Sequence, residues 1–224
     1  MIESRNLTKS FKDGERETRV LNGIDFKAEN GELIAIMGRS GAGKSTFLYQ
    51  LSLLDEPTSG EILIDGRNTH TMKEREKGAF RLTTFGYVFQ DYALLPDLSA
   101  LENVVLPLLM QGVGEPEARV RAAEALIRVG LGHRLKNLPS QLSGGEQQRV
   151  SISRAIAHKP TILFADEPTA NLDSESSHTV MDIFQALHKE GQTIIMVTHE
   201  EEYAKLAERV IHLEDGRIIS DIRN

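Results

Sequence analysis

A glycine-rich segment, GRSGAGKST, extends from Gly38 to Thr46 and constrains the fold of this chain more than any other feature. It fits the pattern G-x-x-x-x-G-K-[ST], follows the apolar run ELIAIMG and precedes a helix predicted over 44–54. In that setting the glycines let successive backbone N–H groups surround an anion, and the start of the helix adds its positive end. The segment therefore predicts a phosphate cradle at the edge of an α/β sheet.

The side chains of this cradle define the ligand more closely. Lys44 can place a point charge on the β- and γ-phosphates of a nucleotide, and the hydroxyl of Ser45 can bind Mg²⁺. The predicted binding residues are Gly38, Arg39, Ser40, Gly41, Ala42, Gly43, Lys44, Ser45 and Thr46. The motif indicates a nucleoside triphosphate but leaves kinases, GTPases and motor ATPases all open.

Strand-like and helix-like segments alternate along the chain, which predicts an α/β fold with a mostly parallel sheet. The expected strands are 1–7, 20–28, 32–38, 60–66, 161–167 and 192–199, and the expected helices are 44–54, 115–129 and 174–189. The middle of the chain, from about 91 to 138, has a mainly helical pattern and is expected to be an inserted subdomain. In the helix predicted over 115–129, we expect the core-facing positions to be Val120, Ala123, Leu126 and Ile127.

Two strands predicted in the second half of the chain end in polar side chains. The run ILFAD brings Asp166 and Glu167 to the carboxyl edge of the sheet, where ligands of parallel sheets bind. Asp166 is a candidate Mg²⁺ ligand through water, and Glu167 is a candidate general base for an attacking water. The alternative is a pair of solvated carboxylates at a strand end. His199 ends the next strand and is a candidate γ-phosphate contact or, alternatively, a structural histidine.

A second glycine-rich helix start is found in the sequence LSGGEQQR, residues 142–149. Ser143 and Glu146 form a predicted capping box, but a Gly-Gly pair in the first helical turn costs about 1–2 kcal/mol relative to alanines. A nucleotide bound in the first cradle does not obviously require a second glycine-rich helix start from the same chain. We therefore expect Ser143, Gly144 and Gly145 to approach a phosphate held by a second copy of the chain.

LSGGEQQR is also the signature sequence of the ATP-binding cassette (ABC) ATPases, and the chain resembles this family from about residue 2 to residue 219. The resemblance implies that Phe11 stacks on adenine, where most members have Tyr; the alternative for Phe11 is a core aromatic. It implies that Gln90 links Mg²⁺ and the attacking water to the helical subdomain. Asp173 matches the loop that reaches the partner subunit, and His199 matches the switch histidine.

The same resemblance sets the expected architecture. It is a P-loop NTPase-type α/β core with a mostly parallel sheet, an N-terminal antiparallel β subdomain and a helical subdomain at about 91–158, all within one domain of residues 1–224. Ser153 replaces the more usual alanine after the signature, and we expect no functional consequence. The intact Glu167 favours hydrolysis over passive nucleotide sensing.

The segment 85–109 resembles the lipoprotein-release, macrolide-export and cell-division cassettes, the LolD, MacB and FtsE types. This resemblance implies a separate integral membrane permease that docks near residues 91–110. A surplus of apolar residues there fits such a surface, or alternatively the core of the helical subdomain: Leu94, Leu95, Leu98, Val104, Val105 and Leu108. The expected function is ATP-driven dimer closure that powers a permease. The alternative is mechanical signalling through a membrane protein without solute transport.

Composition bounds the partners. The formal net charge of −7 gives no general attraction to nucleic acid, so no nucleic-acid partner is expected. There is no cysteine, which excludes disulfides and thiolate metal sites. The longest apolar run in the middle of the chain, Val104–Met110, is too short to span a bilayer. If the protein acts at a membrane, a partner must therefore hold it there; the family resemblance implies that this partner is the permease, at the cytoplasmic face, and that ATP and Mg²⁺ are the cofactors.

Overall fold

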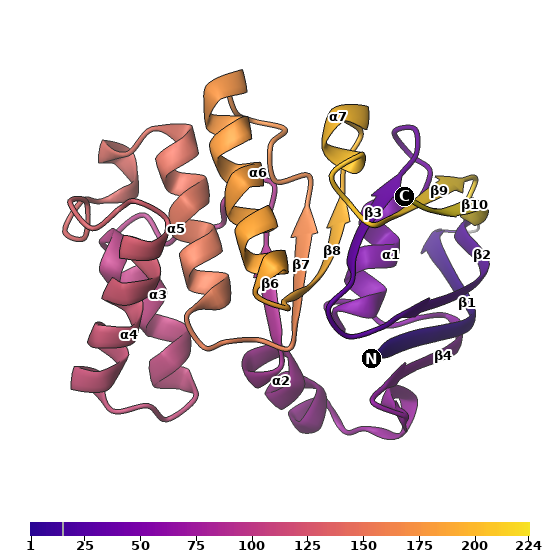
Figure 1. The fold of residues 1–224 in the computed structure, drawn as a ribbon. Helices are drawn as coiled ribbons and strands as arrows, with labels where there is room; N and C mark the ends of the chain where they lie inside the picture. The colour runs from indigo at the N-terminus through magenta and orange to yellow at the C-terminus, as the bar shows by residue number, and fades with distance from the viewer. Residues whose placement is uncertain (15) are drawn as a thin grey trace.

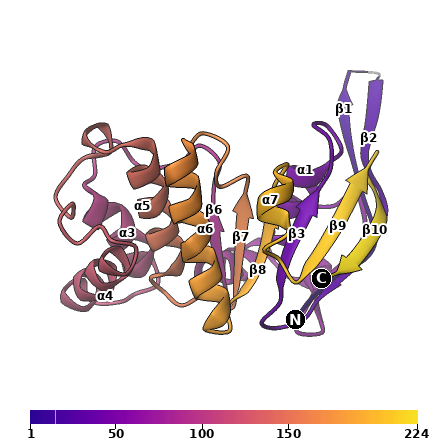
Figure 2. The same ribbon diagram turned by 45° about the horizontal axis from the view of Figure 1, so that its top comes forward.

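The computed structural model describes residues 1–14 and 16–224, which form two β-sheets and a set of helices (Figures 1 and 2). The larger sheet has the order β10-β9-β3-β8-β7-β6, and only the edge strand β10 is antiparallel to its neighbour. Its strands are β3 (Leu33–Met37), β6 (Phe85–Val88), β7 (Ile162–Asp166), β8 (Thr193–Val197), β9 (Arg209–Glu214) and β10 (Arg217–Arg223).

The central strands of this sheet are buried on both faces, as a parallel sheet requires. In β3, Ile34 and Ile36 point into one hydrophobic cluster, whereas Leu33, Ala35 and Met37 point into the other. Successive side chains of a strand point to opposite faces, so an uninterrupted apolar run serves both layers.

The smaller sheet is antiparallel, with the order β2-β1-β4-β5. Its strands are β1 (Ile2–Asp13), β2 (Arg16–Ala28), β4 (Ser59–Ile64) and β5 (Arg67–Asn68), so the first two are longer than predicted. Helix α1 (Lys44–Leu51) contacts strands of both sheets, and its Phe47 lies edge-on to Phe26 of β2 at 5.4 Å. The predicted fold class is confirmed: a mostly parallel α/β core with an N-terminal antiparallel β unit.

The remaining helices lie mainly on the other side of the large sheet. They are α2 (Glu74–Thr83), α3 (Ala100–Met110), α4 (Glu115–Arg128), α5 (Gly144–Ile156), α6 (Ser174–Lys189) and α7 (Glu201–Ala204), with 3₁₀ turns at Thr69–Thr71 and Pro139–Gln141. Figure 1 shows α3, α4 and α5 grouped beyond β6, with α6 between this group and β7–β8. Helix α2 has no buried residue, which explains why no apolar periodicity predicted it.

The predicted core face of α4 is wrong in part. Val120 and Ile127 are 57% and 61% exposed, while Leu126 is buried together with small residues. The small buried residues of α4 are Ala118, Ala122 and Ala125. The reason is close helix packing: the Ser153 hydroxyl of α5 donates to the Ala125 carbonyl oxygen at 3.2 Å, and small side chains allow the two helices to approach this closely. Ser153 therefore joins two helices, a structural role that the sequence did not indicate.

The apolar residues expected at a permease surface divide between two roles. Val104, Val105 and Leu108 are buried in the core of the helical group, so they do not form a surface. Leu95 is exposed, and so are the outward-facing apolar residues of α3, which are Leu106, Leu109 and Met110. In the part of the chain that the structure describes, no helix has the length and apolar character needed to cross a membrane.

Candidate functional site

The phosphate cradle joins β3 to α1 and packs against the antiparallel sheet. Gly43 caps α1 in the left-handed conformation, with φ of 97°, and a side chain there would lie 3.0 Å from the carbonyl oxygen of Val20 in β2. The backbone angle therefore favours glycine here, and a side chain would also force a small shift of the adjacent strand. Lys44 is only 7% exposed, and its Nζ lies 3.3 Å from the Arg39 carbonyl oxygen. The buried Lys44 ammonium group thus binds a backbone carbonyl group of the cradle itself.

Ser45 and Asp166 meet at the carboxyl edge of the parallel sheet. The Ser45 hydroxyl donates to Asp166 Oδ1 at 2.9 Å. Burial raises the pKa of the Asp166 carboxyl above its usual value, and the neighbouring Glu167 carboxylate raises it further against the Ser45 hydrogen bond. A buried carboxylate and a hydroxyl thus lie side by side. Oxygen atoms of this kind are the ligands that Mg²⁺ prefers.

Glu167 stands between two cationic or ionisable groups. Its Oε1 lies 3.7 Å from Lys44 Nζ, and its Oε2 lies 3.1 Å from His199 Nδ1. The parallel pairing of Asp166 with Val197 brings the ends of β7 and β8 together and so places Glu167 beside His199. Glu167 has a left-handed backbone, with φ of 43°, and its N–H donates to the Val197 carbonyl oxygen at 3.0 Å. The geometry unites a cation, a carboxylate and an imidazole at one edge.

These groups line a hollow of about 600 Å³. The lining also includes Glu201 and His212, which sequence analysis missed. His212 is placed there by the pairing of β9 with β3, where it stands opposite Met37. Such pairing joins segments about 175 residues apart, and no local pattern in the sequence reveals it.

Gln90 and Phe11 lie outside this lining. Gln90 follows β6, whose Val88 pairs with Ala165, so Gln90 is level with Glu167 at the same sheet edge. Its side chain is exposed, while its carbonyl oxygen accepts from Asn171 Nδ2 at 3.2 Å. Phe11 is 47% exposed on the hairpin of β1 and β2, which contradicts the alternative of a core aromatic. Lys9 Nζ lies 5.0 Å from the centre of its ring.

The predicted capping box at the start of α5 is present. The Glu146 N–H donates to Ser143 Oγ at 3.2 Å, and the Ser143 N–H donates to Glu146 Oε2 at 2.9 Å. A side chain at Gly145 would lie 2.5 Å from Ser176 Oγ, so packing of α5 against α6 within one chain already requires this glycine. Asp173 caps α6 by accepting from the Ser176 N–H at 2.9 Å.

The signature segment does not reach the cradle of its own chain. Figures 1 and 2 show α5 and α1 on opposite sides of α6 and β7. Among the residues that the structure describes, none of Ser143, Gly144, Gly145 or Asp173 lines the hollow. The structure therefore brings together Lys44, Ser45, Asp166, Glu167 and His199, and it keeps the four predicted trans contacts apart from them.

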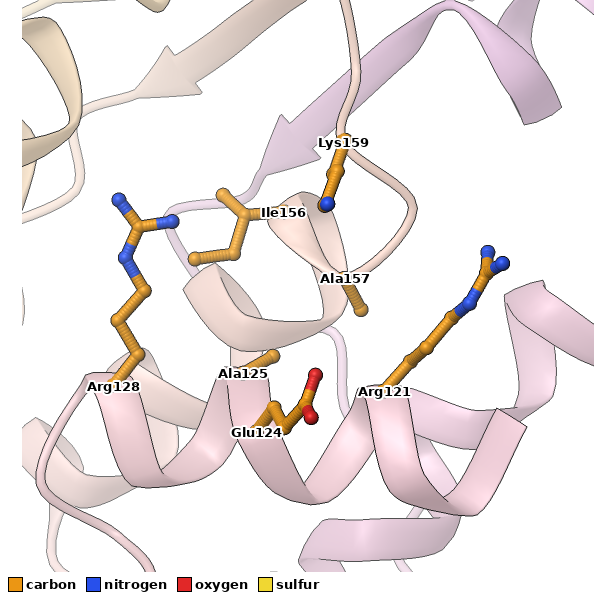
Figure 3. A pocket seen from close by; sticks show the side chains of 7 residues that line it. All are labelled: Arg121, Glu124, Ala125, Arg128, Ile156, Ala157 and Lys159. Carbon is orange, nitrogen blue, oxygen red and sulfur yellow. The ribbon is translucent and has the colours of Figure 1, made fainter. Parts of the chain in front are cut away.

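A different hollow lies at the opposite edge of the sheet. In Figure 3 the side chains of Arg121 and Arg128 extend on either side of Glu124, and Lys159 approaches from the loop after α5. Arg121 pairs with Glu117, and Arg128 pairs with Glu190. Of the charged residues that line this hollow, Arg121, Arg128 and Lys159 are cationic and Glu124 is anionic, and the two arginines each pair with a carboxylate outside the lining.

Comparisons with known proteins agree with this geometry. Residues 21–170 match the family model described as ABC transporter. The chain is 50% identical over 222 residues to an uncharacterized ABC transporter ATP-binding protein, MJ1508, of Methanocaldococcus jannaschii, covering 99% of both chains. It is 44% identical over 222 residues to the lipoprotein-releasing system ATP-binding protein LolD of Aquifex aeolicus, covering 99% of this chain and 97% of LolD.

Longer relatives and solved structures extend the comparison. The chain is 47% identical to the macrolide export ATP-binding/permease protein MacB of Agrobacterium fabrum over 224 residues, but it spans only 35% of that protein's length. A solved structure, described as the dimeric post-hydrolysis state of the ATP-binding cassette MJ0796 bound to ADP and Pi, superposes with a TM-score of 0.93. The two sequences are 40% identical, and the match covers 100% of this chain and 98% of that one.

The cradle, the strand-end carboxylates, the signature helix and these matches over the whole chain lead to one conclusion. The chain belongs to the ABC transporter family, as an ATP-binding and ATP-hydrolysing cassette of the group that includes LolD and MacB.

Proposed function

We propose that this cassette powers a separate membrane permease of an export or release system for lipoproteins, peptides or macrolides, from the cytoplasmic face of the membrane. The observation that carries the proposal is the contact series from Lys44 to Glu167 to His199 beside the Ser45–Asp166 pair. This array has the groups needed to bind a triphosphate and to activate a water. The similarity to LolD and MacB supports the class of transport system.

The phosphate-binding step uses backbone and side-chain donors of the cradle, residues 38–46. Their N–H groups and the Lys44 ammonium bind the β- and γ-phosphates, while the exposed Phe11 ring offers a surface for adenine. The oxygen pair of Ser45 and Asp166, together with Gln90, fits Mg²⁺ with few protein ligands. That ion, when bound, neutralises charge on the phosphate oxygens.

Glu167 and His199 then serve the hydrolytic step. The Glu167 carboxylate accepts a proton from water as the water oxygen bonds to the γ-phosphorus and the bond to the ADP oxygen breaks. His199 can contact the γ-phosphate and orients Glu167 through their 3.1 Å contact. Lys44, which lies 3.7 Å from Glu167, turns to the phosphates when ATP enters and so frees the carboxylate.

The arrangement of the signature supports a dimer. Ser143, Gly144, Gly145 and Asp173 lie away from the hollow of their own chain, and the similar cassette MJ0796 is described as dimeric. In the dimer, these residues of each copy contact the ATP that is bound to the other copy. Shifting an open-to-closed equilibrium from 1:99 to 99:1 requires about 5.5 kcal/mol. A charge-assisted hydrogen bond supplies about 1.5–3 kcal/mol, so one or two γ-phosphate contacts per site suffice.

The permease contact belongs to the region around residues 91–110. Its exposed apolar side chains are Leu95, Leu106, Leu109 and Met110. Exposed apolar residues grouped on one helix and its preceding loop are typical of a surface that meets another protein.

Replacement of Glu167 tests this function. Glu167→Gln keeps the shape of the side chain but cannot accept a proton, so we expect ATP binding without turnover, with a loss of about 10²-fold or more in kcat. The trapped variant should elute as a dimer with ATP in size-exclusion chromatography. Lys44→Ala is the matched control, which should neither bind ATP nor dimerise. A Glu167→Gln protein that stays monomeric with ATP bound contradicts the proposal.

A further inference from the structure

Gln148 of α5 is a fully buried polar residue that none of the steps above uses. Its side chain is 0% exposed. Its Nε2 group donates to the Pro168 carbonyl oxygen at 2.8 Å and to the Phe89 carbonyl oxygen at 3.4 Å. Both amide hydrogens are therefore directed at backbone oxygens of two different loops. The Oε1 atom is buried and has no hydrogen-bond partner among the described residues.

The two carbonyl groups are adjacent in sequence to two proposed catalytic residues. Pro168 directly follows Glu167, and Phe89 directly precedes Gln90. Gln148 of the signature helix thus donates hydrogen bonds to both of these neighbouring residues. Because an amide has a fixed separation between its two hydrogens, it sets the distance between the two loops as well as holding each one.

The loop at Glu167 needs such a support. A left-handed backbone at a residue other than glycine costs about 1–2 kcal/mol, and Glu167 adopts it with φ of 43°. Two backbone bonds hold it, from its own N–H to Val197 and from the Ala170 N–H to its carbonyl oxygen. The bond from Gln148 to Pro168 fixes the peptide that comes next.

We propose that Gln148 is a positioning residue for ATP hydrolysis, which holds the backbones of Glu167 and Gln90 at a set separation. This inference rests on the proposed roles of those two residues. In this role Gln148 acts through the placement of the Glu167 carboxylate and not through a contact with the reacting atoms. A displacement of a reacting group by about 1 Å can lower a rate by about 10²-fold. The Lys44 and Phe11 contacts to ATP do not pass through Gln148.

The test separates turnover from binding. Gln148→Met keeps the length of the side chain and removes both donors, so we expect kcat to fall between about tenfold and a hundredfold. The Kd for ATP, measured with a fluorescent analogue, should stay within twofold, since the cradle is unchanged. Gln148→Leu, which also has no donor and is similar in volume, should show the same split between kcat and Kd. It takes the place of the first variant if Gln148→Met does not fold.

A half-buried glutamine that also bonds to loop carbonyl groups, Gln192, provides the matched control. Gln192 Nε2 also donates to loop carbonyl oxygens, those of Pro160 and Thr161, at the far edge of the sheet. Gln192→Met should lower thermal stability and leave kcat unchanged. Folded Gln148 variants with wild-type kcat overturn the inference, as does a fall in kcat matched by an equal loss of affinity. Glu167→Gln, measured in the same assay, distinguishes a failure of this inference from a failure of the proposed function. Full ATPase activity of Glu167→Gln would contradict the proposed function itself.

Discussion

At the scale of single residues, backbone carbonyl oxygens near the site are held by side chains of α5. Arg154 is one example: its guanidinium donates to the carbonyl oxygens of Tyr92 and Ala93, and burial lowers its pKa from the usual value. Tyr92 and Ala93 are both left-handed, with φ of 60° and 50°. A positive charge directed at two strained peptides stabilises a loop that neither residue would form by its own preference.

His158 offers a pH test at the same scale. Its ring contacts the Phe85 carbonyl oxygen through Nε2 at 3.1 Å, while Nδ1 is buried with no partner in the described part of the chain. Burial lowers the pKa of His158, and the Phe85 contact opposes this only in part. Folding therefore favours the neutral ring, so this contribution to stability is complete above the unfolded-state pKa of about 6.5. It is lost as the pH falls below that value.

The measurement is urea unfolding at pH 8 and at pH 5.5, for the wild type and for His158→Gln. We expect the variant to lose less stability between the two pH values, because its side chain does not titrate. His178, whose pKa is raised by its contact with the Ser174 carbonyl oxygen, contributes with the opposite sign in both proteins and cancels in the comparison. Equal losses in the two proteins contradict the assignment.

At the scale of elements, α3 has two faces with different roles. Asn103, buried at 1% exposure, uses its side chain to bind the carbonyl oxygens of Leu95, Leu98 and Ser99, which ties the loop before α3 onto the helix. Val104, Val105 and Leu108 pack into the core on that side, while Met110 on the opposite side is 65% exposed. The apolar excess of this segment thus serves both the core and a surface.

A pair of lysine substitutions in α3 separates these roles. Val105→Lys buries an unpaired ammonium group and should lower the free energy of unfolding by several kcal/mol, about 4 or more. Met110→Lys should change stability by no more than about 0.5 kcal/mol. In a pull-down with the membrane partner, Met110→Lys should bind weakly while its basal ATP hydrolysis persists. If Met110→Lys binds the membrane partner as well as the wild type does, Met110 is not part of the permease contact.

At the scale of the whole molecule, the cradle lies where the two sheets meet. Helix α1 contacts β1 and β2 of one sheet and β7 and β8 of the other, and Gly43 approaches β2 directly. A ligand bound to the cradle therefore stabilises both sheets together. With ATP at about 100 times its Kd, the expected gain is about 2.7 kcal/mol, which corresponds to roughly 5–10 °C in Tm.

Thermal unfolding with and without ATP and Mg²⁺ measures this gain. Lys44→Ala should lose most of the shift because its ammonium group no longer meets the phosphates. Lys159→Ala is the control, since Lys159 is exposed in the loop after α5 at the other edge of the sheet and should keep the full shift. Equal shifts in the two variants would place the nucleotide elsewhere.

Much of the site was predictable because its parts are local in sequence. The cradle, the capping box at Ser143 and the carboxylates after an apolar strand each depend on residues within about ten positions of one another. Alternating strands and helices then required a parallel sheet, whose carboxyl edge collects the ends of its strands. The amino-acid sequence by itself thus determined the fold class, the phosphate cradle and the candidate groups for hydrolysis.

Other features were decided only by tertiary packing. Apolar periodicity assigned Val120 and Ile127 to the core, but the close approach of α5 to α4 admits alanines there and leaves both residues outside. Gly145 is required by Ser176, and Gln148 meets Phe89 and Pro168, each across a gap of at least 20 residues. Contacts of this kind depend on the distances between packed elements, and local propensity contains no information on those distances.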